Sequence, residues 1–272
     1  MKSPRLLLAA ALCAGLSITA LPARAVVFGF DTDAEFDDNF VKLGASGTST
    51  IATFTFASSE RAVRKTGTGT QSVLFDTGAT GGSGGSGGTS GDGADLFADV
   101  DLSADIRISA FNTPSFGLWS RVNADASSGY LGLVNIINAT SVQLRIFDSN
   151  SNPGANGVGT VLVNETLSTG SFTLDTSTFY TVSFTTSTVS PSEVAFELSL
   201  SSVGGATIVS TTATDTTTPV TGAGQVGFRA ASSTLYVDNF GVASSAIPEP
   251  GSAGLIIGVA VFGLIATRRR RT

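Results

Sequence analysis

The chain has 272 residues, with 15 basic and 21 acidic side chains, one cysteine and no histidine. The lack of histidine excludes Ser-His and Cys-His nucleophile systems and zinc sites built on imidazole. The formal net charge of −6 disfavours binding to nucleic acid and to anionic lipid headgroups.

Residues 1–25 have the three parts of a secretory signal peptide. Lys2 and Arg5 precede an apolar stretch over residues 6–21, and a small-x-small cleavage site ends at Ala25. We therefore expect export through the Sec translocon and cleavage by signal peptidase. The only cysteine, Cys13, lies in this segment, so the mature chain from Val26 cannot form a disulfide. Its own core or bound metal ions must hold it together.

The body of the chain is more acidic than the whole. Three of the 15 basic residues precede residue 26 and four follow residue 267, while one of the 21 acids, Glu249, belongs to the C-terminal segment. This leaves 8 basic and 20 acidic residues, a net charge of about −12. Such a surface suits a soluble exported domain, and its carboxylates are the ligands that calcium prefers.

Most of residues 26–246 follow a period of two. Apolar and polar residues alternate over 115–123, 142–147, 180–184, 194–200 and 235–240, and clusters of Asn, Gly, Pro and Ser separate these stretches. Alternation rich in β-branched and aromatic residues is typical of half-buried antiparallel strands. The pattern predicts one all-β domain, a two-sheet antiparallel jelly-roll sandwich.

Residues 78–93 interrupt this pattern, because they are almost entirely Gly, Ser and Thr. We expect a flexible loop inserted between strands. The adjoining stretch 91–97 imitates one copy of a Gly-x-Gly-x-Asp calcium repeat. Since that repeat binds calcium only in tandem, a loop with solvated aspartates is the favoured interpretation.

Two groups of motifs resemble the concanavalin A-like lectin/glucanase superfamily, in its laminin-G-like branch. One runs from Phe116 through Gly129-Tyr130-Leu131-Gly132-Leu133, and the other joins 225–229 to the last stretch, 235–240, of the form Tyr-x-Asp-Asn-hydrophobic. The resemblance implies that the last strand closes the sandwich beside the N-terminal strand.

The same resemblance implies a structural calcium ion where the first and last strands meet. The candidate ligands are Asp238 and an early acid among Asp31, Asp33 and Glu35. The alternative is that Asp238 caps a turn or bonds locally to the backbone.

Glucanases of the superfamily carry Glu-x-Asp-x-x-Glu or Glu-x-Asp-x-Glu on one strand. The nearest match here begins at Glu35 and Asp37 but lacks the second glutamate. Glu193 and Glu197 share a strand face, yet four residues separate them by about 13 Å, whereas glycosidase carboxyl groups lie ~5–9.5 Å apart. We therefore expect no enzymatic activity.

The alternation of residue types over 115–123 predicts a binding surface on one face of this strand. Phe116, Leu118 and Val122 alternate with more polar residues and are expected in the core. The opposite face, together with a neighbouring strand, would present an aromatic plate beside planar hydrogen-bonding groups, which is the chemistry of glycan recognition. Its candidate residues are Trp119, Arg121, Asn123, Tyr130, Gln143 and Arg145. The alternative is a face that packs under loops or is simply solvated.

The C-terminal segment 247–272 has three parts in order. Pro248-Glu249-Pro250 precedes an apolar run over 253–266, and the run is followed by Arg268, Arg269, Arg270 and Arg271. The run is only just long enough to span a bilayer, and the arginines favour the cytoplasmic side. This arrangement resembles the PEP-CTERM tail, which implies an exosortase-type processing enzyme as a partner.

The favoured interpretation is a non-catalytic surface or extracellular-matrix protein associated with exopolysaccharide or biofilm. The segments at the two termini predict an inner-membrane anchor before processing, then the envelope surface or matrix of a Gram-negative type of bacterium. A carbohydrate-binding, lectin-like module is the alternative, with extracellular polysaccharide as its partner. A glycan hydrolase is the least favoured of the three.

Overall fold

The computed structural model describes residues 24–43, 48–75, 96–123, 127–149, 159–231 and 234–244. Ala25–Ser244 forms one compact unit. Residues 1–23 of the predicted signal peptide, the loop 78–93 and the whole sorting segment 247–272 lie outside the described residues. Within the described ranges, no helix is long and apolar enough to cross a membrane.

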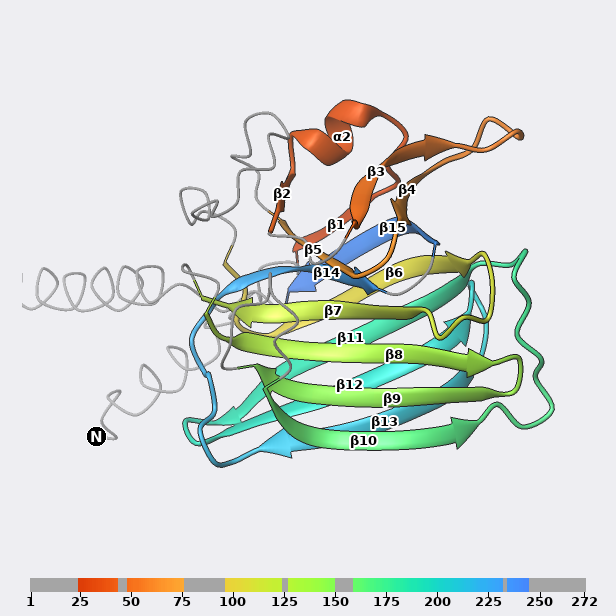
Figure 1. The fold of residues 1–272 in the computed structure, drawn as a ribbon. Coiled ribbons are helices and arrows are strands. Elements are labelled where there is room, and N and C mark those ends of the chain that lie inside the picture. Colours follow the sequence, from red (N-terminus) through yellow and green to blue (C-terminus); the bar gives the residue numbers. More distant parts are fainter. Residues whose placement is uncertain are drawn as a thin grey trace, which may run out of the picture. The chain divides into compact units, whose positions relative to one another are not determined.

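The described strands form two antiparallel sheets that face each other (Figure 1). The first, the eight-stranded sheet, has the order β13-β12-β11-β6-β15-β4-β3, and β1 also pairs with β15. Its strands are β1 (Arg24–Phe28), β3 (Thr50–Thr55), β4 (Arg61–Thr66), β6 (Val100–Ile108), β11 (Tyr180–Ser190), β12 (Glu193–Ser202), β13 (Thr207–Asp215) and β15 (Leu235–Ser244).

The second, the seven-stranded sheet, has the order β10-β9-β8-β7-β14-β5-β2. Its strands are β2 (Phe40–Lys42), β5 (Thr70–Phe75), β7 (Ser115–Val122), β8 (Gly129–Asn138), β9 (Ser141–Ser149), β10 (Thr160–Ser168) and β14 (Gln225–Ala231). The predicted all-β, two-sheet antiparallel jelly-roll sandwich is confirmed. The last strand, β15, lies beside the N-terminal strand β1, as the sequence motifs implied.

A short helix, α2 (Asp33–Asp37), was not predicted. Its N-cap is Thr32, whose hydroxyl accepts from the Glu35 N–H at 3.1 Å. The Glu35 carboxylate in turn accepts from the backbone N–H groups of Gly29, at 3.0 Å, and Asp31, at 2.9 Å. This reciprocal capping stabilises a single turn that is too short to leave a helical period in the sequence.

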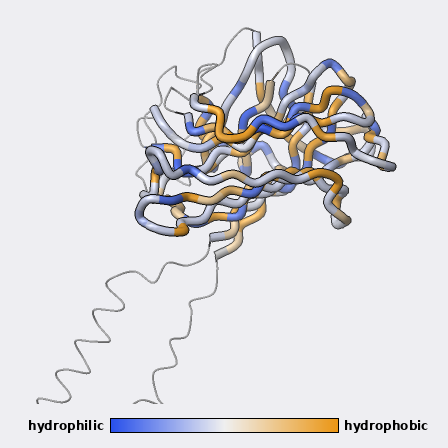
Figure 2. The backbone as a smooth tube through the Cα atoms, turned by 90° about the horizontal axis from the view of Figure 1, so that it is seen from below, coloured by the Kyte–Doolittle hydropathy of each residue, from blue (hydrophilic) through white to orange (hydrophobic). Residues whose placement is uncertain are grey.

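The core lies between the two sheets and is filled by side chains from both. Figure 2 shows how hydrophobic and hydrophilic residues are distributed along the backbone. The Phe184 ring of β11 packs against Gly132 of β8, where the absence of a side chain leaves room for the ring. A Cβ added at Gly132 would come within 2.5 Å of the Phe184 Cδ2 atom. A glycine here is therefore a packing requirement.

A β-bulge near the end of β7 reverses this alternation. Val122 pairs with Gln225 and Trp119 with Gly227, so β7 has one residue more than β14 over the same span. Arg121 has φ 52°, in the left-handed region. An extra residue turns the following side chains to the other face. Arg121 therefore points between the sheets and Val122 points outward, so the predicted orientations of these two residues are wrong.

Candidate functional site

The outward side chains of the seven-stranded sheet form three rows that cross the strands, because directly paired residues of antiparallel strands share a face. The apolar row is Leu74, Gly227, Trp119, Leu131 and Phe147. The arginine row is Ser72, Arg229, Gly117, Leu133, Arg145 and Asn164. The amide row is Thr70, Ala231, Ser115, Asn135, Gln143 and Thr166.

The apolar row is covered. Trp119 is 0% exposed and belongs to a second hydrophobic cluster outside the sheet, together with Leu43, Val122 and Phe147. Its indole N–H lies 3.4 Å from the Ser72 hydroxyl. Trp119 thus points to the predicted face, but the prediction that it is an exposed plate is wrong because its ring surfaces are already packed.

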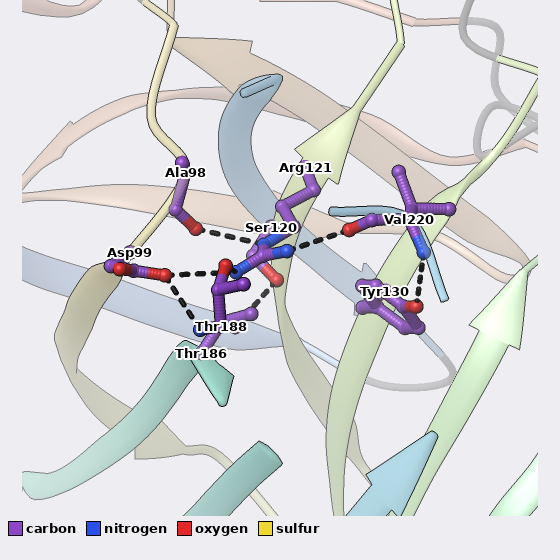
Figure 3. Close-up of polar contacts among 8 residues, drawn as sticks. All are labelled: Ala98, Asp99, Ser120, Arg121, Tyr130, Thr186, Thr188 and Val220. Carbon is purple, nitrogen blue, oxygen red and sulfur yellow. Dashed lines mark hydrogen bonds and ion pairs between the residues drawn. The ribbon is translucent and has the colours of Figure 1, made fainter. Parts of the chain in front are cut away.

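Arg121 is 0% exposed and holds the end of the sandwich together (Figure 3). Its Nε donates to the Ala98 carbonyl at 2.8 Å and its Nη1 to the Val220 carbonyl at 2.6 Å. Its Nη2 donates to Asp99 at 3.0 Å and to the Thr188 hydroxyl at 2.8 Å. Burial lowers the pKa of Arg121, and Asp99 opposes that shift. These acceptors join segments from both sheets, so Arg121 is a structural residue.

Tyr130 also lies in the core and not on the predicted face. Its hydroxyl donates to Asp215 at 2.8 Å and accepts from the Val220 N–H at 2.7 Å, and its ring lies 4.5 Å from that of Phe196. Burial is the main cause that raises the pKa of Tyr130. The residue therefore has no surface to offer a ligand, because it is 0% exposed.

Asn123 serves the turn between β7 and β8. Its Oδ1 accepts from the backbone N–H groups of Ser127, at 2.8 Å, and Ser128, at 2.9 Å. Its Nδ2 donates to the Ser127 hydroxyl at 2.9 Å. Of the six predicted glycan-binding residues, only Gln143 and Arg145 thus lie on the open part of the outer face.

That open part is a groove of about 380 Å³, called the outer groove below. It joins the arginine row to the amide row, and Thr113, which precedes β7, also lines it. Its lining residues are Thr70, Thr113, Ser115, Leu133, Asn135, Ile137, Gln143, Arg145, Arg229 and Ala231.

A chain of hydrogen bonds fixes the polar side chains along the groove. The Gln143 Oε1 accepts from the Asn135 Nδ2 at 2.9 Å and from the Arg145 Nε at 2.9 Å, and also from the Arg145 Nη2. The Gln143 Nε2 donates to the Asn164 Oδ1 at 2.9 Å. Three amides and one guanidinium are therefore held in place before any ligand arrives.

Arg229 was missed by the sequence analysis. It is 8% exposed, and its one hydrogen bond runs from Nη2 to the Thr70 hydroxyl at 3.4 Å. Burial, and after it the charge of Arg145, lowers the pKa of Arg229. A period of two places Arg229 on the face of Gly227. Its position near Arg145, however, depends on the strand order, which the sequence does not show.

The predicted calcium ligands are only partly brought together. The pKa of Asp238 is raised to about 6, chiefly by burial and further by the nearby charges of Asp105, Asp31 and Glu35. Asp238 also accepts from the Asn239 N–H at 2.8 Å. Asp33 instead forms an ion pair with Arg61. In the described part of the chain no group of three or more suitable side chains is arranged to hold a metal ion, so calcium binding stays a prediction.

The sequence-matched carboxylates do not form a catalytic pair at the groove. Glu35 and Asp37 lie on α2, where Glu35 caps the helix and Asp37 lies 3.7 Å from the Lys42 ammonium. Glu193 and Glu197 lie on β12, in the other sheet. The residues that line the outer groove include no carboxylate.

No family model matches the chain, and no curated protein does. Three solved structures are similar in fold. The carbohydrate-binding module CBM66 of Bacillus subtilis is 16% identical, with a TM-score of 0.43 over 74% of this chain and 98% of that one. The β-glucanase of Bacillus licheniformis is 8% identical, with a TM-score of 0.46 over 84% and 100%. The PL-14 alginate lyase of Aplysia kurodai is 13% identical, with a TM-score of 0.46 over 82% and 98%.

At these identities and TM-scores the likeness extends to the general architecture and not to a ligand or a reaction.

The contrast between Arg121 and Arg145 gives a matched test of their roles. We expect Arg121→Met to lower the free energy of unfolding by about 2–4 kcal/mol, because it leaves Asp99 and three other acceptors without their donor. The same change at half-buried Arg145 should cost less than about 1 kcal/mol. Urea unfolding followed by tryptophan fluorescence measures both, and equal small losses would contradict the structural role of Arg121.

Proposed function

We propose that the protein is an exported, non-catalytic cell-surface or extracellular-matrix protein whose sandwich binds polysaccharide in the outer groove. The observation that carries the proposal is the prearranged chain of hydrogen bonds among Asn135, Gln143, Asn164 and Arg145 on an open sheet face. This groove replaces the aromatic plate around Trp119 as the candidate site.

The groove has the chemistry that sugars require. Sugar hydroxyls both donate and accept hydrogen bonds, and planar amides and guanidinium groups match them in pairs. Ile137, which is only partly buried, adds apolar surface for the C–H faces of the rings. Since the polar side chains already bond to one another, a ligand would cause little further loss of side-chain entropy.

The lining favours binding over catalysis. Glycoside hydrolysis requires two carboxyl groups that flank the scissile bond. Among the described residues that line the groove, none is Asp, Glu, Tyr or Lys, and the chain has no histidine. None of the usual general acids or bases therefore lines the groove.

The location is proposed from the two terminal segments. Residues 1–25 would direct export through the Sec translocon, and the tail from Pro248 to Arg271 would anchor the chain in the inner membrane. An exosortase-type enzyme would then cleave near Pro248-Glu249-Pro250 and pass the sandwich to a polysaccharide-rich surface or matrix.

The groove assignment can be tested by affinity electrophoresis of the full chain, in detergent, through gels that contain dissolved polysaccharides. Polysaccharide should retard the unmodified protein. We expect Asn135→Leu combined with Gln143→Leu to weaken retardation at least tenfold, since two hydrogen-bonding groups of about 1 kcal/mol each are lost.

A matched control changes the outer face of the other sheet. Ser183→Ala combined with Thr185→Val alters a shallow groove over β6, β11 and β15, and it should leave retardation unchanged. Loss of binding in this variant but not in the Asn135/Gln143 variant would place the site on the eight-stranded sheet and contradict the groove assignment.

The tail is tested by the mass of the protein in an exosortase-encoding bacterium. We expect the mature form to end before Ala253, because cleavage follows the Pro-Glu-Pro motif. A variant with alanine at Pro248, Glu249 and Pro250 should keep its C-terminus and stay in the inner membrane. An intact C-terminus in the envelope form of the unmodified protein would contradict the sorting proposal.

A further inference from the structure

We propose that the outer groove selects a polysaccharide whose sugars carry carboxylate groups, and that Arg229 and Arg145 bind the carboxylate between them. The inference rests on the proposed function and adds the charge of the ligand to it.

Within the part of the chain that the structure describes, Arg229 is a buried cation without an anion. A guanidinium has five N–H donors and stays charged in proteins, yet Arg229 uses one donor, in a long contact of 3.4 Å to Thr70. The ion pairs of the described residues are Lys42–Asp37, Arg61–Asp33 and Arg121–Asp99, and neither Arg229 nor Arg145 takes part in one.

Arg121 shows what a structural arginine looks like in the same protein. It is buried, like Arg229, but four acceptors satisfy it and one of them is the Asp99 carboxylate. Arg229 has no such set among the described residues, and the positive charge of Arg145, which faces the same groove, repels it. A buried charge left in this state costs stability unless a ligand compensates it.

The geometry of the arginine row lets both guanidinium groups reach one ligand. Arg229 on β14 pairs with Gly117, Gly117 with Leu133, and Leu133 with Arg145 on β9. Three strand spacings separate the two Cα atoms by about 14 Å, a distance that two extended arginine side chains can bridge. The side chains of Leu131 and Leu133 lean over Gly117, where an added Cβ would come within 2.6 and 3.0 Å of their Cδ1 atoms. Both arginines line the same groove beside this apolar floor.

An anionic ligand fits this arrangement better than a neutral one. A carboxylate accepts two parallel N–H groups from one guanidinium and has lone pairs left for a second, and such charge-assisted bonds are roughly twice as strong as neutral ones. The amide row next to it leaves Asn135 and Gln143 for the hydroxyls of the same sugar or its neighbour. No acidic side chain in the lining repels the ligand, although the body of the chain is acidic.

The test compares polygalacturonate with its fully methyl-esterified form, which has the same backbone but no charge. Affinity electrophoresis of the full chain in detergent should show at least tenfold tighter binding to the acid. Arg229→Gln and Arg145→Gln should each abolish this preference, so that acid and ester bind alike. Arg64→Gln, which changes an arginine over the Phe54 ring of the other sheet, should keep it.

Three outcomes would overturn the inference. Equal binding of acid and ester by the unmodified protein would refute the charge selection while leaving the proposed function intact. Stronger binding to dextran sulfate than to polygalacturonate would assign the groove to sulfate esters. No binding to any of these polymers, in a protein whose cooperative thermal unfolding shows that it is folded, would remove both the inference and the proposed function. Because Arg145 is half exposed, its variant tests the inference even if Arg229→Gln fails to fold.

Discussion

The hydrogen bonds of Arg121 hold the bulge that sets which residues of β7 face the core and which face outward. One extra residue between Trp119 and Val122 turns the Arg121 guanidinium between the sheets. There it binds two carbonyls, a carboxylate and a hydroxyl from segments that are distant in sequence. The left-handed backbone at Arg121 costs on the order of 1 kcal/mol, and its four bonds offset that cost.

The bulge also divides the outer face of the seven-stranded sheet. Because Val122 now points outward, it extends the apolar cluster around Trp119 and Leu131. That half of the face is covered, and the ligand groove is limited to the arginine and amide rows. Gly117 lies in the arginine row, between the two arginines. Arg229, on β14, lacks an anion among the described residues, and Arg145, on β9, is held by Gln143. Strand β7 thus supplies the structural arginine, Arg121, and the glycine that separates the two arginines of the proposed binding pair.

Strands such as β9, β11 and β12 were predictable because one face is buried and the other is more exposed, so a period of two is imposed on the sequence. Gln143 and Arg145 were placed correctly because no irregularity in β9 separates them from the core residues Val142 and Leu144. Arg121 was not, since nothing in the residue types marks a left-handed backbone at an arginine. Trp119 and Tyr130 were misjudged for different reasons: the first is covered from outside, and the second belongs to the inner face.

Arg229 shows a different limit of sequence reasoning. The period of two in the sequence places Arg229 on the same strand face as Gly227, but a lone arginine on a strand is ordinarily a solvated side chain. Only the order β9-β8-β7-β14 brings it into the groove of Arg145, and that order depends on the pairing of Arg229 with Gly117, 112 positions earlier in the chain. The position of Asp31 and Glu35 near Asp238 likewise depends on strand pairing, because β1 and β15 pair across almost the whole domain.

The central claim is that two arginines of one sheet hold the carboxylate of a bound polysaccharide. A crystal structure with a galacturonate oligosaccharide tests it most directly. The account predicts a sugar carboxylate between the guanidinium groups of Arg145 and Arg229, with a ring hydroxyl bonded to Gln143 or Asn135. An oligosaccharide ordered on the eight-stranded sheet, or bound in the outer groove with its carboxylates directed into solvent, would contradict it.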